Sequence, residues 1–365
     1  MTRKKKIAII GLKGLPAFGG AATVGQSLVE QLTGDFDFTV YSTASHADRD
    51  FDPSGYHQFI FRSFPIGRLN VFYYYLMSGI HAVMLRKYDL VHLHHIDGAF
   101  ILPLLRLRYK VMVTSHARPQ ESEKWGRLAR VLFNRNEKTV MRWSSVFTAV
   151  SLKLRDYYRE HYGRDIYYIP NGVSIQETGP APIDLSGRAL VFAAGRIIPL
   201  KGCHIMLKAL NEISYPGPVK IIGNVDQMPS YRKELLDLSA GLNAQFMGLI
   251  RDKEKLLRMI RDAKLFIFPS YNENMSMMLL EAASTRTPII CSDIPENKVI
   301  FNEEEVLFFR SEDHHDLAKK IGWSLAHMDL MEQNSARAYD KVLAQFTYER
   351  ISLEYKQLYD ALLGG

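Results

Sequence analysis

Two glutamates are the side chains whose types and spacing point most directly to chemistry. Glu273 and Glu281 lie eight positions apart, after an apolar run at 265–268 and a short loop. Apolar residues 277–280 precede Glu281, which predicts that this carboxylate lies inside a helix and is mostly buried, with Glu273 at the helix mouth. Because moving a carboxylate out of water is costly, a buried glutamate requires a polar partner. The pair is therefore a candidate site for a polar ligand.

A basic loop is the second candidate. Arg196 and Lys201 lie between two glycines, Gly195 and Gly202, after a predicted strand and before a predicted helix. The free N–H groups and the dipole of a helix N-terminus favour anions, and two cations beside them favour a diphosphate. The alternative interpretation is a solvated loop with two surface cations. The Gly-Lys-Ser/Thr ending of a P-loop is absent.

Glycines follow the first predicted strand, and a histidine follows the strand predicted at 110–115. Gly19 and Gly20 would let backbone N–H groups approach a phosphate or sugar closely, although a tight turn also explains them. The G-x-G-x-x-G spacing is absent, which argues against a nicotinamide cofactor. His116 lies where open α/β sheets bind ligands, at the carboxyl end of a strand, but single histidines are often structural.

Two short patterns resemble metal sites, and both favour an ordinary interpretation. His92 and His94 alternate onto one face of a strand, but apart from Asp97 no carboxylate or cysteine lies at ligand spacing. The D-x-D pattern of metal-dependent sugar transferases occurs between Asp48 and Asp52, in a polar loop that predicts solvated side chains. We therefore expect no metal site.

The segment 124–143 predicts an amphipathic helix with one basic face. One interpretation is a helix that packs its apolar face on the core and exposes the cations to water. The other is a helix that contacts anionic lipid headgroups or a phosphorylated lipid substrate. The expected apolar face contains Trp125, Leu128, Ala129, Leu132, Val140 and Trp143, and the basic face contains Lys124, Arg127, Arg130, Lys138 and Arg142.

The composition indicates an ordinary globular protein with two domains. The chain has 365 residues, of which 47% are hydrophobic and 23% charged. Its two cysteines, Cys203 and Cys291, lie in segments that we expect to be buried, which favours a reduced, cytoplasmic protein. No signal peptide and no apolar run of about 18 residues occur, so we expect no membrane span.

The positive charge is concentrated in the first half of the chain. Residues 1–180 hold 24 Lys and Arg against 15 Asp and Glu, a balance of +9, whereas residues 181–365 hold 22 against 24, a balance of −2. This asymmetry favours an anionic partner, either a membrane surface or a phosphorylated substrate. Nucleic acid is not expected, because no nucleic-acid-binding motif is present.

Alternating apolar strands and helices predict two successive α/β domains with parallel sheets. Pro and Gly residues near 170–190 mark a linker, which gives domains at 1–172 and 187–346, a linker at 173–186 and a C-terminal helix at 347–365 that packs back across the junction. Strands are expected at 6–10, 37–42, 90–94, 110–115, 146–151, 190–194, 219–222, 244–247, 265–268 and 288–292, and helices at 23–32, 70–86, 202–213, 231–240, 252–262 and 348–363.

Together these features resemble the family 4 retaining glycosyltransferases over nearly the whole chain. That resemblance implies the GT-B architecture, an α/β fold with two facing Rossmann-like, doubly wound parallel-sheet domains and a cleft between them. The family's glutamate pair matches Glu273 and Glu281, and its Gly-Arg…Lys-Gly segment matches residues 195–202. The family's glycine-rich first loop matches Gly19 and Gly20, its histidine matches His116, and its junction motif appears here as Asn171-Gly-Val-Ser174.

The resemblance also implies a role for each matching residue. Arg196 and Lys201 would neutralise the departing diphosphate of a sugar nucleotide, Glu281 would hold the ribose, and Glu273 would contact the donor sugar. The fixed cations would stabilise the negative charge that develops on the leaving group. The remaining implied contacts are Gly19 and Gly20 beneath the phosphate or acceptor, His116 beside the transferred sugar, and the donor-binding segment Asn274, Met275, Ser276 and Met277, which replaces glycines usual in the family.

We therefore expect a cytoplasmic, retaining, metal-independent hexosyl-type glycosyltransferase. It would move a sugar from a nucleoside-diphosphate sugar to a glycan or lipid-linked glycan in surface polysaccharide assembly, with no further cofactor, and the inner membrane face is a candidate partner. Two alternatives remain. One is a sugar-nucleotide epimerase or glycan phosphorylase on the same fold, and the other is a non-catalytic module that binds a nucleotide or glycan.

Overall fold

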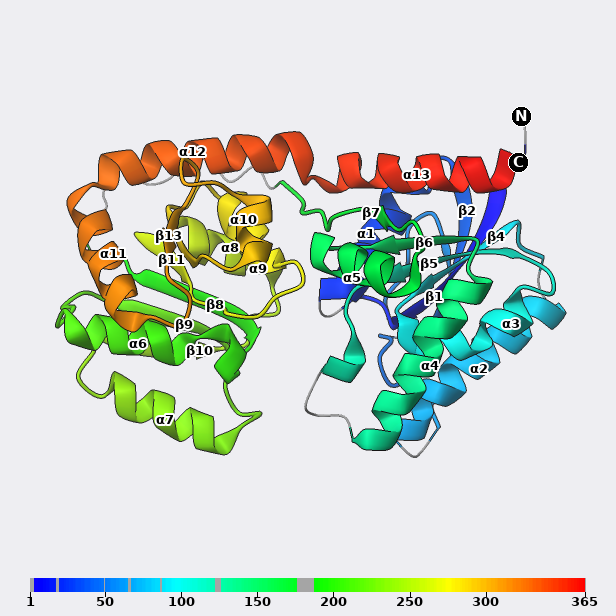
Figure 1. Ribbon diagram of the computed structural model, residues 1–365, viewed down its shortest axis with the longest axis horizontal. Helices are drawn as coiled ribbons and strands as arrows, with labels where there is room; N and C mark the ends of the chain where they lie inside the picture. Colours follow the sequence, from blue (N-terminus) through cyan, green and yellow to red (C-terminus); the bar gives the residue numbers. More distant parts are fainter. Residues whose placement is uncertain are drawn as a thin grey trace. The chain divides into compact units, whose positions relative to one another are not determined.

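Two compact units make up the chain in its computed structural model, which describes residues 3–17, 20–48, 50–64, 67–85, 87–121, 126–175 and 187–364. The N-terminal unit comprises Met1–Asn171 and Tyr348–Gly365, and the C-terminal unit comprises Gly172–Thr347. Each is built on its own parallel β-sheet (Figure 1).

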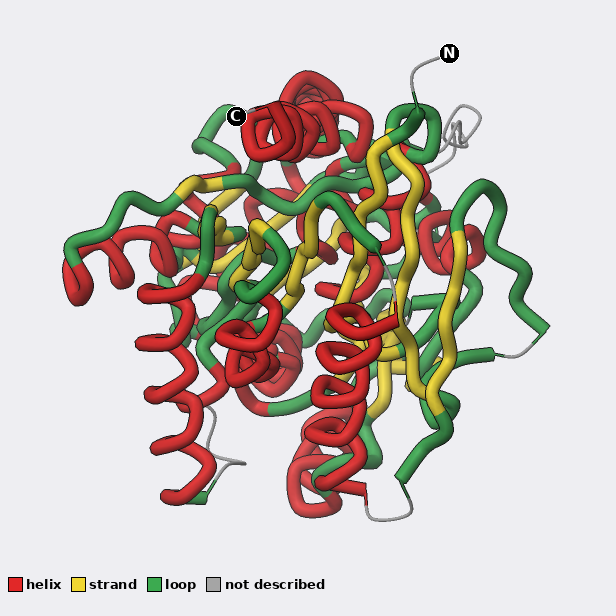
Figure 2. The backbone as a smooth tube through the Cα atoms, turned by 90° about the vertical axis from the view of Figure 1, so that its right-hand side faces the viewer, coloured by secondary structure: helices red, strands yellow, loops and turns green. Residues whose placement is uncertain are grey.

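The N-terminal unit contains a seven-stranded sheet in its described residues, with the order β3-β2-β1-β4-β5-β6-β7. All neighbouring strands pair in parallel, and β4 is buried along its whole length. Figure 2 shows helices on both sides of these strands, as expected when most crossovers are helical. The strands are β1 Lys5–Lys13, β2 Phe36–Thr43, β3 His57–Phe61, β4 Leu90–His94, β5 Lys110–Ser115, β6 Val146–Ala149 and β7 Tyr167–Tyr168; the helices are α1 Gly20–Leu32, α2 Gly67–Leu85, α3 Leu102–Leu105, α4 Arg127–Trp143, α5 Leu152–Tyr162 and α13 Tyr348–Gly364, with 3₁₀ turns η1 Ile96–Ile101 and η2 Pro119–Glu121.

The C-terminal unit repeats this arrangement with six strands among its described residues, in the order β10-β9-β8-β11-β12-β13. In both units the order reverses direction beside the first strand, at β1/β4 and at β8/β11. Ligands of such sheets bind at this switch point, outside the carboxyl ends of the strands. The elements are β8 Leu190–Arg196, β9 Val219–Asn224, β10 Ala244–Gly248, β11 Leu265–Phe268, β12 Ile289–Ser292, β13 Leu307–Phe309, α6 Cys203–Glu212, α7 Pro229–Ser239, α8 Lys253–Arg261, α9 Met277–Ala283, α10 Pro295–Ile300, α11 His314–Ala326, α12 Met328–Gln345 and η3 Pro199–Lys201.

The last helix, α13, packs on the sheet of the N-terminal unit. Tyr355 and Tyr359 are buried there in one core cluster with residues of β1 and β2. The Tyr359 ring meets Phe36 edge to face at 5.5 Å, and its hydroxyl is hydrogen-bonded to His92 Nδ1 at 2.7 Å. Burying one large apolar side chain contributes about 1.5–3 kcal/mol, so these contacts bind the end of the chain firmly to this unit.

Helix α4 buries only part of the face that its sequence predicts. Val140 is fully buried, but Leu132 is 53% exposed and Trp143 is 36% exposed, whereas Glu137 is only 1% exposed. The physical reason is that polar partners compensate the buried carboxylate, as described below, so the helix turns a mixed face inward. Cys203 and Cys291 are fully buried, as expected. Within the described helices, none combines the length and apolarity that a membrane crossing requires.

Candidate functional site

The switch point of the C-terminal unit brings together the basic loop and the first glutamate. Strand β8 ends at the exposed Arg196, and the loop continues through η3 to Gly202. Gly202 has a φ of +71°, and a Cβ atom there would lie 2.0 Å from the carbonyl oxygen of Pro269. Only glycine permits this approach, which places the loop after β8 directly against the loop after β11.

Lys201 and Glu273 form an ion pair across these two loops. Lys201 Nζ lies 2.5 Å from Glu273 Oε1, and the two side chains are 27% and 10% exposed. The Ser270 hydroxyl donates to the same carboxylate oxygen at 2.7 Å. Tyr271 N donates to the carbonyl oxygen of Leu200 at 3.1 Å, which joins the backbones of the two loops. The carboxylate of Glu273 is therefore held in place by groups from both strands.

Behind this pair lies a buried hydrogen-bond network that the sequence did not reveal. The Ser292 hydroxyl donates to the carbonyl oxygen of Ser270. Asn297 is fully buried, and its Nδ2 donates to the backbone oxygen of Ser292 at 3.0 Å and to its hydroxyl at 3.1 Å. These residues orient the loop that carries Glu273. Serine and asparagine at such positions give no specific signal in a sequence, because their partners are distant along the chain.

Glu281 lies inside α9 and is 7% exposed, as its apolar neighbours predict. Its partner is Lys253, the first residue of α8, which the sequence also did not reveal. Burial raises the pKa of Glu281, and the charge of Lys253 opposes that shift. The helix begins at Met277 and is capped by Ser276, whose hydroxyl accepts from Leu279 N at 3.3 Å. Glu273 therefore lies in the loop before the helix.

The segment between the glutamates is half-buried and partly fixed by the core. Met275 and Met277 pack against the apolar cluster of the C-terminal unit, and Asn274 is half-buried. Ser276 is 5% exposed and serves as the helix cap. Methionine adapts its shape readily, so this segment can line a pocket whose form differs from one built of glycines.

In the N-terminal unit, His116 follows β5 and is 8% exposed. Its Nε2 lies 3.2 Å from His94 Nδ1, and burial, followed by the neighbouring histidines, holds the pKa of His116 well below its usual range. His92 has a structural environment, because Tyr359 and Thr114 occupy both of its ring nitrogens. Gly20 is the exposed first residue of α1, and Gly19 lies outside the described residues.

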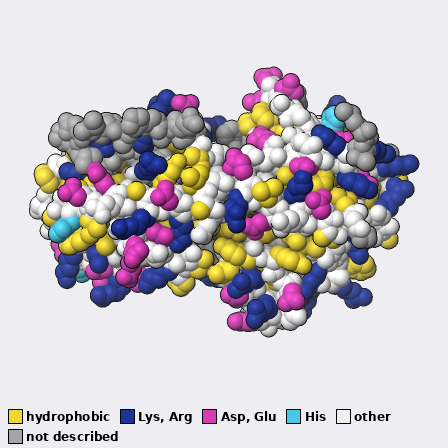
Figure 3. Space-filling model, turned by 90° about the horizontal axis from the view of Figure 1, so that it is seen from above, with side chains coloured by type: hydrophobic (Ala, Val, Ile, Leu, Met, Phe, Trp, Pro, Cys, Tyr) yellow, Lys and Arg dark blue, Asp and Glu magenta, His cyan; other side chains and the backbone are white. Residues whose placement is uncertain are grey.

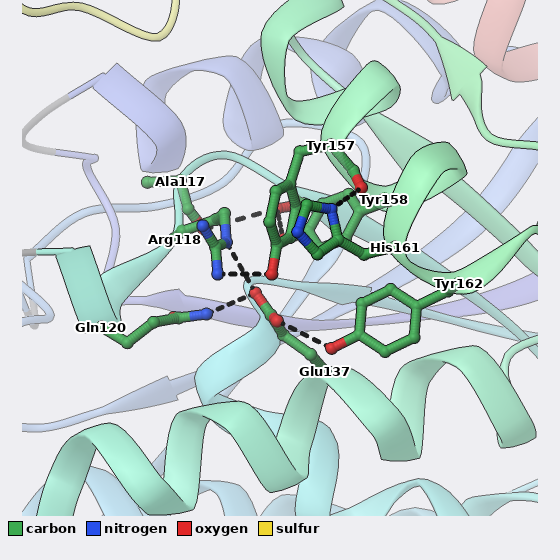
Figure 4. Close-up of polar contacts among 9 residues, drawn as sticks. Ala117, Arg118, Gln120, Glu137, Tyr157, Tyr158, His161 and Tyr162 are labelled. Carbon is green, nitrogen blue, oxygen red and sulfur yellow. Dashed lines mark hydrogen bonds and ion pairs between the residues drawn. The ribbon is translucent and has the colours of Figure 1, made fainter.

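A buried ion pair fixes the segment that follows His116 (Figure 4). Arg118 Nε donates to Glu137 Oε1 at 2.9 Å, and Gln120 Nε2 donates to the same oxygen. Tyr162 donates to Glu137 Oε2 at 3.0 Å, and the Arg118 guanidinium stacks 3.5 Å above the ring of Tyr157. The carboxylate is thereby well compensated in a buried setting. This cluster ties the His116 segment to α4 and α5.

Carboxylates and histidines elsewhere do not join these sites. Asp48, Asp50 and Asp52 are exposed, as expected for solvated side chains. Of the residues that the structure describes, one group could supply three metal ligands: Glu212, His314 and His315. Glu212 ends α6, about 14 Å from the helix start near Gly202 at a rise of 1.5 Å per residue. That group is therefore separate from the switch point.

Comparison with known proteins identifies the family. Residues 180–341 match the family described as glycosyl transferases group 1, and residues 18–177 match glycosyltransferase family 4. The chain belongs to glycosyltransferase family 4. This glycosyltransferase is 24% identical over 289 residues to a phosphatidyl-myo-inositol mannosyltransferase of Mycolicibacterium smegmatis, covering 76% of the present chain and 72% of that protein.

Solved structures confirm the fold of the glycosyltransferase. Sucrose-phosphate synthase from Thermosynechococcus elongatus superposes with a TM-score of 0.80 at 18% identity, covering 99% of this chain and 100% of that one. Anabaena Alr3699/HepE, solved in complex with UDP and glucose, gives a TM-score of 0.78 at 16% identity, covering 98% and 100%. The expected GT-B architecture, with two Rossmann-like parallel sheets, is thus confirmed.

The site residues expected in the glycosyltransferase lie in two different units. Arg196, Lys201, Glu273 and Glu281 all belong to the C-terminal unit, where the structure pairs Lys201 with Glu273. His116 belongs to the N-terminal unit. Their roles toward a substrate remain predictions.

Proposed function

We propose that this glycosyltransferase transfers a hexose-type sugar, with retention of configuration, from a nucleoside-diphosphate sugar to a glycan or lipid-linked glycan acceptor. The observation that carries the proposal is the ion pair of Lys201 with Glu273 at the β8/β11 switch point, with Arg196 at the end of β8 in the same loop that leads to α6. Cations at that point favour a diphosphate, and the adjoining carboxylate suits a sugar hydroxyl.

The reaction breaks the bond between the anomeric carbon and the diphosphate and forms a bond from that carbon to an acceptor hydroxyl oxygen, which loses its proton. The broken bond leaves negative charge on the departing phosphate. Arg196 and Lys201 stabilise that charge in the transition state. Glu273 binds hydroxyls of the donor sugar, and its ion pair keeps Lys201 directed toward the diphosphate. Glu281 binds the ribose hydroxyls, and residues 274–277 shape the sugar pocket. The donor substrate is the only cofactor that this scheme needs, and transfer proceeds without a metal ion.

A lipid-linked acceptor is supported by the name of the mycobacterial relative, in which phosphatidyl-myo-inositol and mannose both appear. The face of the molecule in Figure 3 carries acidic and basic side chains intermixed, so it offers no single-signed surface for anionic lipid. Helix α4 offers a positively charged surface, because the single acidic residue between Arg127 and Trp143 is the buried Glu137. Its exposed side chains include the apolar Val131, Leu132 and Trp143 and the cations Arg127, Arg130, Arg135, Lys138 and Arg142.

Exposed cations interleaved with exposed apolar side chains suit the boundary between lipid headgroups and acyl chains. We therefore propose that α4 binds the cytoplasmic face of a membrane. There the enzyme would act in surface polysaccharide assembly. Vesicle sedimentation tests this placement. Wild type should sediment with anionic vesicles at low salt and not with neutral ones. A variant with Arg130→Glu and Arg142→Glu should lose that binding, whereas Lys233→Glu with Lys319→Glu, on the C-terminal unit, should retain it. Equal binding by both variants would reject the placement.

Donor use is tested with nucleoside diphosphates and their sugars. A thermal-shift panel should show stabilisation by one nucleoside diphosphate, since a ligand that binds the folded state raises apparent stability. Incubation of the matching sugar nucleotide with EDTA and acceptor should yield a glycoside, and Glu273→Ala should abolish the product without unfolding the chain. Arg258→Ala, which removes an exposed cation on α8, should behave as wild type. An epimerised sugar nucleotide formed without acceptor would favour the epimerase alternative instead.

A further inference from the structure

The switch point of the N-terminal unit carries a polar cluster that the proposed donor chemistry does not use. Strands β1 and β4 pair in parallel, with Ile10 opposite Leu93 at the end of the ladder. Gly11 has a φ of +120°, and a Cβ atom there would lie 1.9 Å from the carbonyl oxygen of His94. The two backbones therefore approach each other as closely as glycine allows. This approach brings the residues after β1 next to those after β4.

Two residues at this point adopt strained backbone conformations. Lys13 has a φ of 70° and His95 a φ of 77°, in the left-handed region that non-glycine residues rarely occupy. Three other described residues, Ser214, Arg286 and Glu312, share this property, and each lies in a turn next to a helix. Strained residues of this kind persist only where the surrounding structure holds them in place. They cluster at ligand sites.

Both strained residues face one carboxylate, Asp97. Lys13 Nζ lies 3.6 Å from Asp97 Oδ2, and His95 Nδ1 lies 4.0 Å from Asp97 Oδ1. The three side chains are 21–28% exposed, so the cluster is partly open to solvent. Oδ1 itself is buried and accepts no hydrogen bond. A buried carboxylate oxygen without a donor is uncommon in folded proteins.

The cluster continues to His116 through the ring of His95, whose centroid lies 4.9 Å from that of His116. His94 Nδ1 and His116 Nε2 share one hydrogen bond, so one ring donates and the other accepts. Burial lowers the pKa of both rings and keeps them neutral. Whichever ring donates, one of the two remaining nitrogens, His94 Nε2 and His116 Nδ1, is a donor and the other is an acceptor. Neither His94 Nε2 nor His116 Nδ1 has a partner.

We propose that Lys13, His95 and Asp97 form a binding site for hydroxyl groups of the sugar acceptor. Asp97 Oδ1 accepts a hydrogen bond from one acceptor hydroxyl, and the free ring nitrogen of His116 binds a second. Lys13 and His95 hold the carboxylate in position. This inference rests on the proposed function and names the part of the N-terminal unit that selects the acceptor.

The charges of the site favour a neutral polyol over an anion. Lys13 compensates Asp97, and the neutral histidines add no charge. A phosphate would therefore meet the carboxylate without a net attraction. A sugar hydroxyl both donates and accepts, which matches one carboxylate oxygen and one imidazole nitrogen. A site built for hydroxyl hydrogen bonds rejects ligands that lack them.

Saturation-transfer NMR on the full chain tests the inference. The probes are methyl α-mannoside, methyl β-glucoside, N-acetylglucosamine and myo-inositol. Wild type should bind at least one of these polyols. Asp97→Asn should weaken that binding by about ten- to hundred-fold, from the strength of a hydrogen bond to a charged group. Asp37→Asn removes a comparable ion pair, with Lys6 at 3.8 Å, and should leave binding unchanged.

Stabilisation by a nucleoside diphosphate separates this inference from the proposed function. Asp97→Asn should keep the same thermal shift with the nucleoside diphosphate as wild type, which also shows that the variant is folded. If Asp97→Asn does not fold, Lys13→Gln provides the second variant, with the same expected loss. Polyol binding that survives in the folded variant, or wild type that binds none of the four polyols, overturns the inference. A wild type that binds no nucleoside diphosphate counts against the proposed function alone.

Discussion

Replacing Glu281 by glutamine should make the protein more stable and a poorer nucleotide binder. Glu281 is 7% exposed and lies among apolar residues of α9, so its charge is maintained at a cost. Its partner Lys253 is 47% exposed and can be solvated by water when the carboxylate is neutralised. Glutamine has nearly the same shape but no charge. The variant therefore removes the desolvation cost without creating a cavity.

The size of both effects follows from this environment. The substitution removes the desolvation cost of the carboxylate and leaves the charge of Lys253, which is 47% exposed and solvated by water, so we expect a gain of about 1 kcal/mol in unfolding free energy. For a unit of this size, that change raises the melting temperature by about 2–4 °C. Hydrogen bonds from ribose hydroxyls to a carboxylate are stronger than those to an amide, so nucleoside diphosphate binding should weaken by about 10- to 100-fold.

Glu305 offers a matched control in the same unit. Its carboxylate is 12% exposed and pairs with Lys341 at 2.8 Å, and it also accepts from Asn302 N at 2.8 Å. Glu305→Gln should therefore lower the melting temperature and leave nucleotide binding unchanged. Calorimetry and isothermal titration of the two variants measure both quantities. A less stable Glu281→Gln, or one that binds nucleoside diphosphates like wild type, would refute the reasoning.

The pH dependence of the melting temperature tests the same substitution independently. Burial raises the pKa of Glu281 above its ordinary value of 4.5, so its contribution to stability is fully present below pH 4.5 and is lost as the pH rises through the raised pKa. Glutamine does not titrate. The variant's advantage should be largest at neutral pH, and the two melting temperatures should converge as the pH falls toward 4.5. A difference that is constant with pH would contradict this assignment.

Three further substitutions test the remaining parts of the structure. Arg196→Ala should weaken nucleoside diphosphate binding by about tenfold and leave nucleoside binding nearly unchanged, as titration with both ligands would show. Glu137→Gln leaves Arg118, whose side chain is only 14% exposed, without its charge partner and should cost about 3 kcal/mol of unfolding free energy, measured by denaturant titration with nucleotide binding retained. Tyr359→Phe removes the hydrogen bond to the buried His92 and should cost about 1–2 kcal/mol in the same measurement.

The sequence predicts the central strands best and the edge strands worst. The expected strands at 90–94, 110–115 and 265–268 coincide with β4, β5 and β11, because these strands are rich in apolar residues and buried along nearly their whole length. Strands β3, β7 and β13 were not predicted, and all three form sheet edges. An edge strand buries fewer residues, so its sequence shows a weaker apolar pattern. Its pairing is decided by its neighbour, which lies elsewhere in the sequence.

The same limit applies to the site. The apolar surroundings of Glu281 are local, so its burial was predictable, but Lys253 lies on another helix and has no local signal. The helical-wheel prediction for α4 was wrong for Leu132 and Trp143, because such a prediction assumes that apolar residues face inward. Glu137 is buried instead, since Arg118 compensates its charge from a distant segment. Buried charges therefore become predictable only when their partners are known.

The stereochemistry of the product shows most clearly whether this glycosyltransferase transfers sugar with retention. NMR of the anomeric proton should be recorded while the enzyme consumes its sugar nucleotide in EDTA with acceptor present. We expect a glycoside with the donor's anomeric configuration, formed by wild type and absent with Glu273→Ala. An inverted product, or full activity in Glu273→Ala, would contradict this expectation.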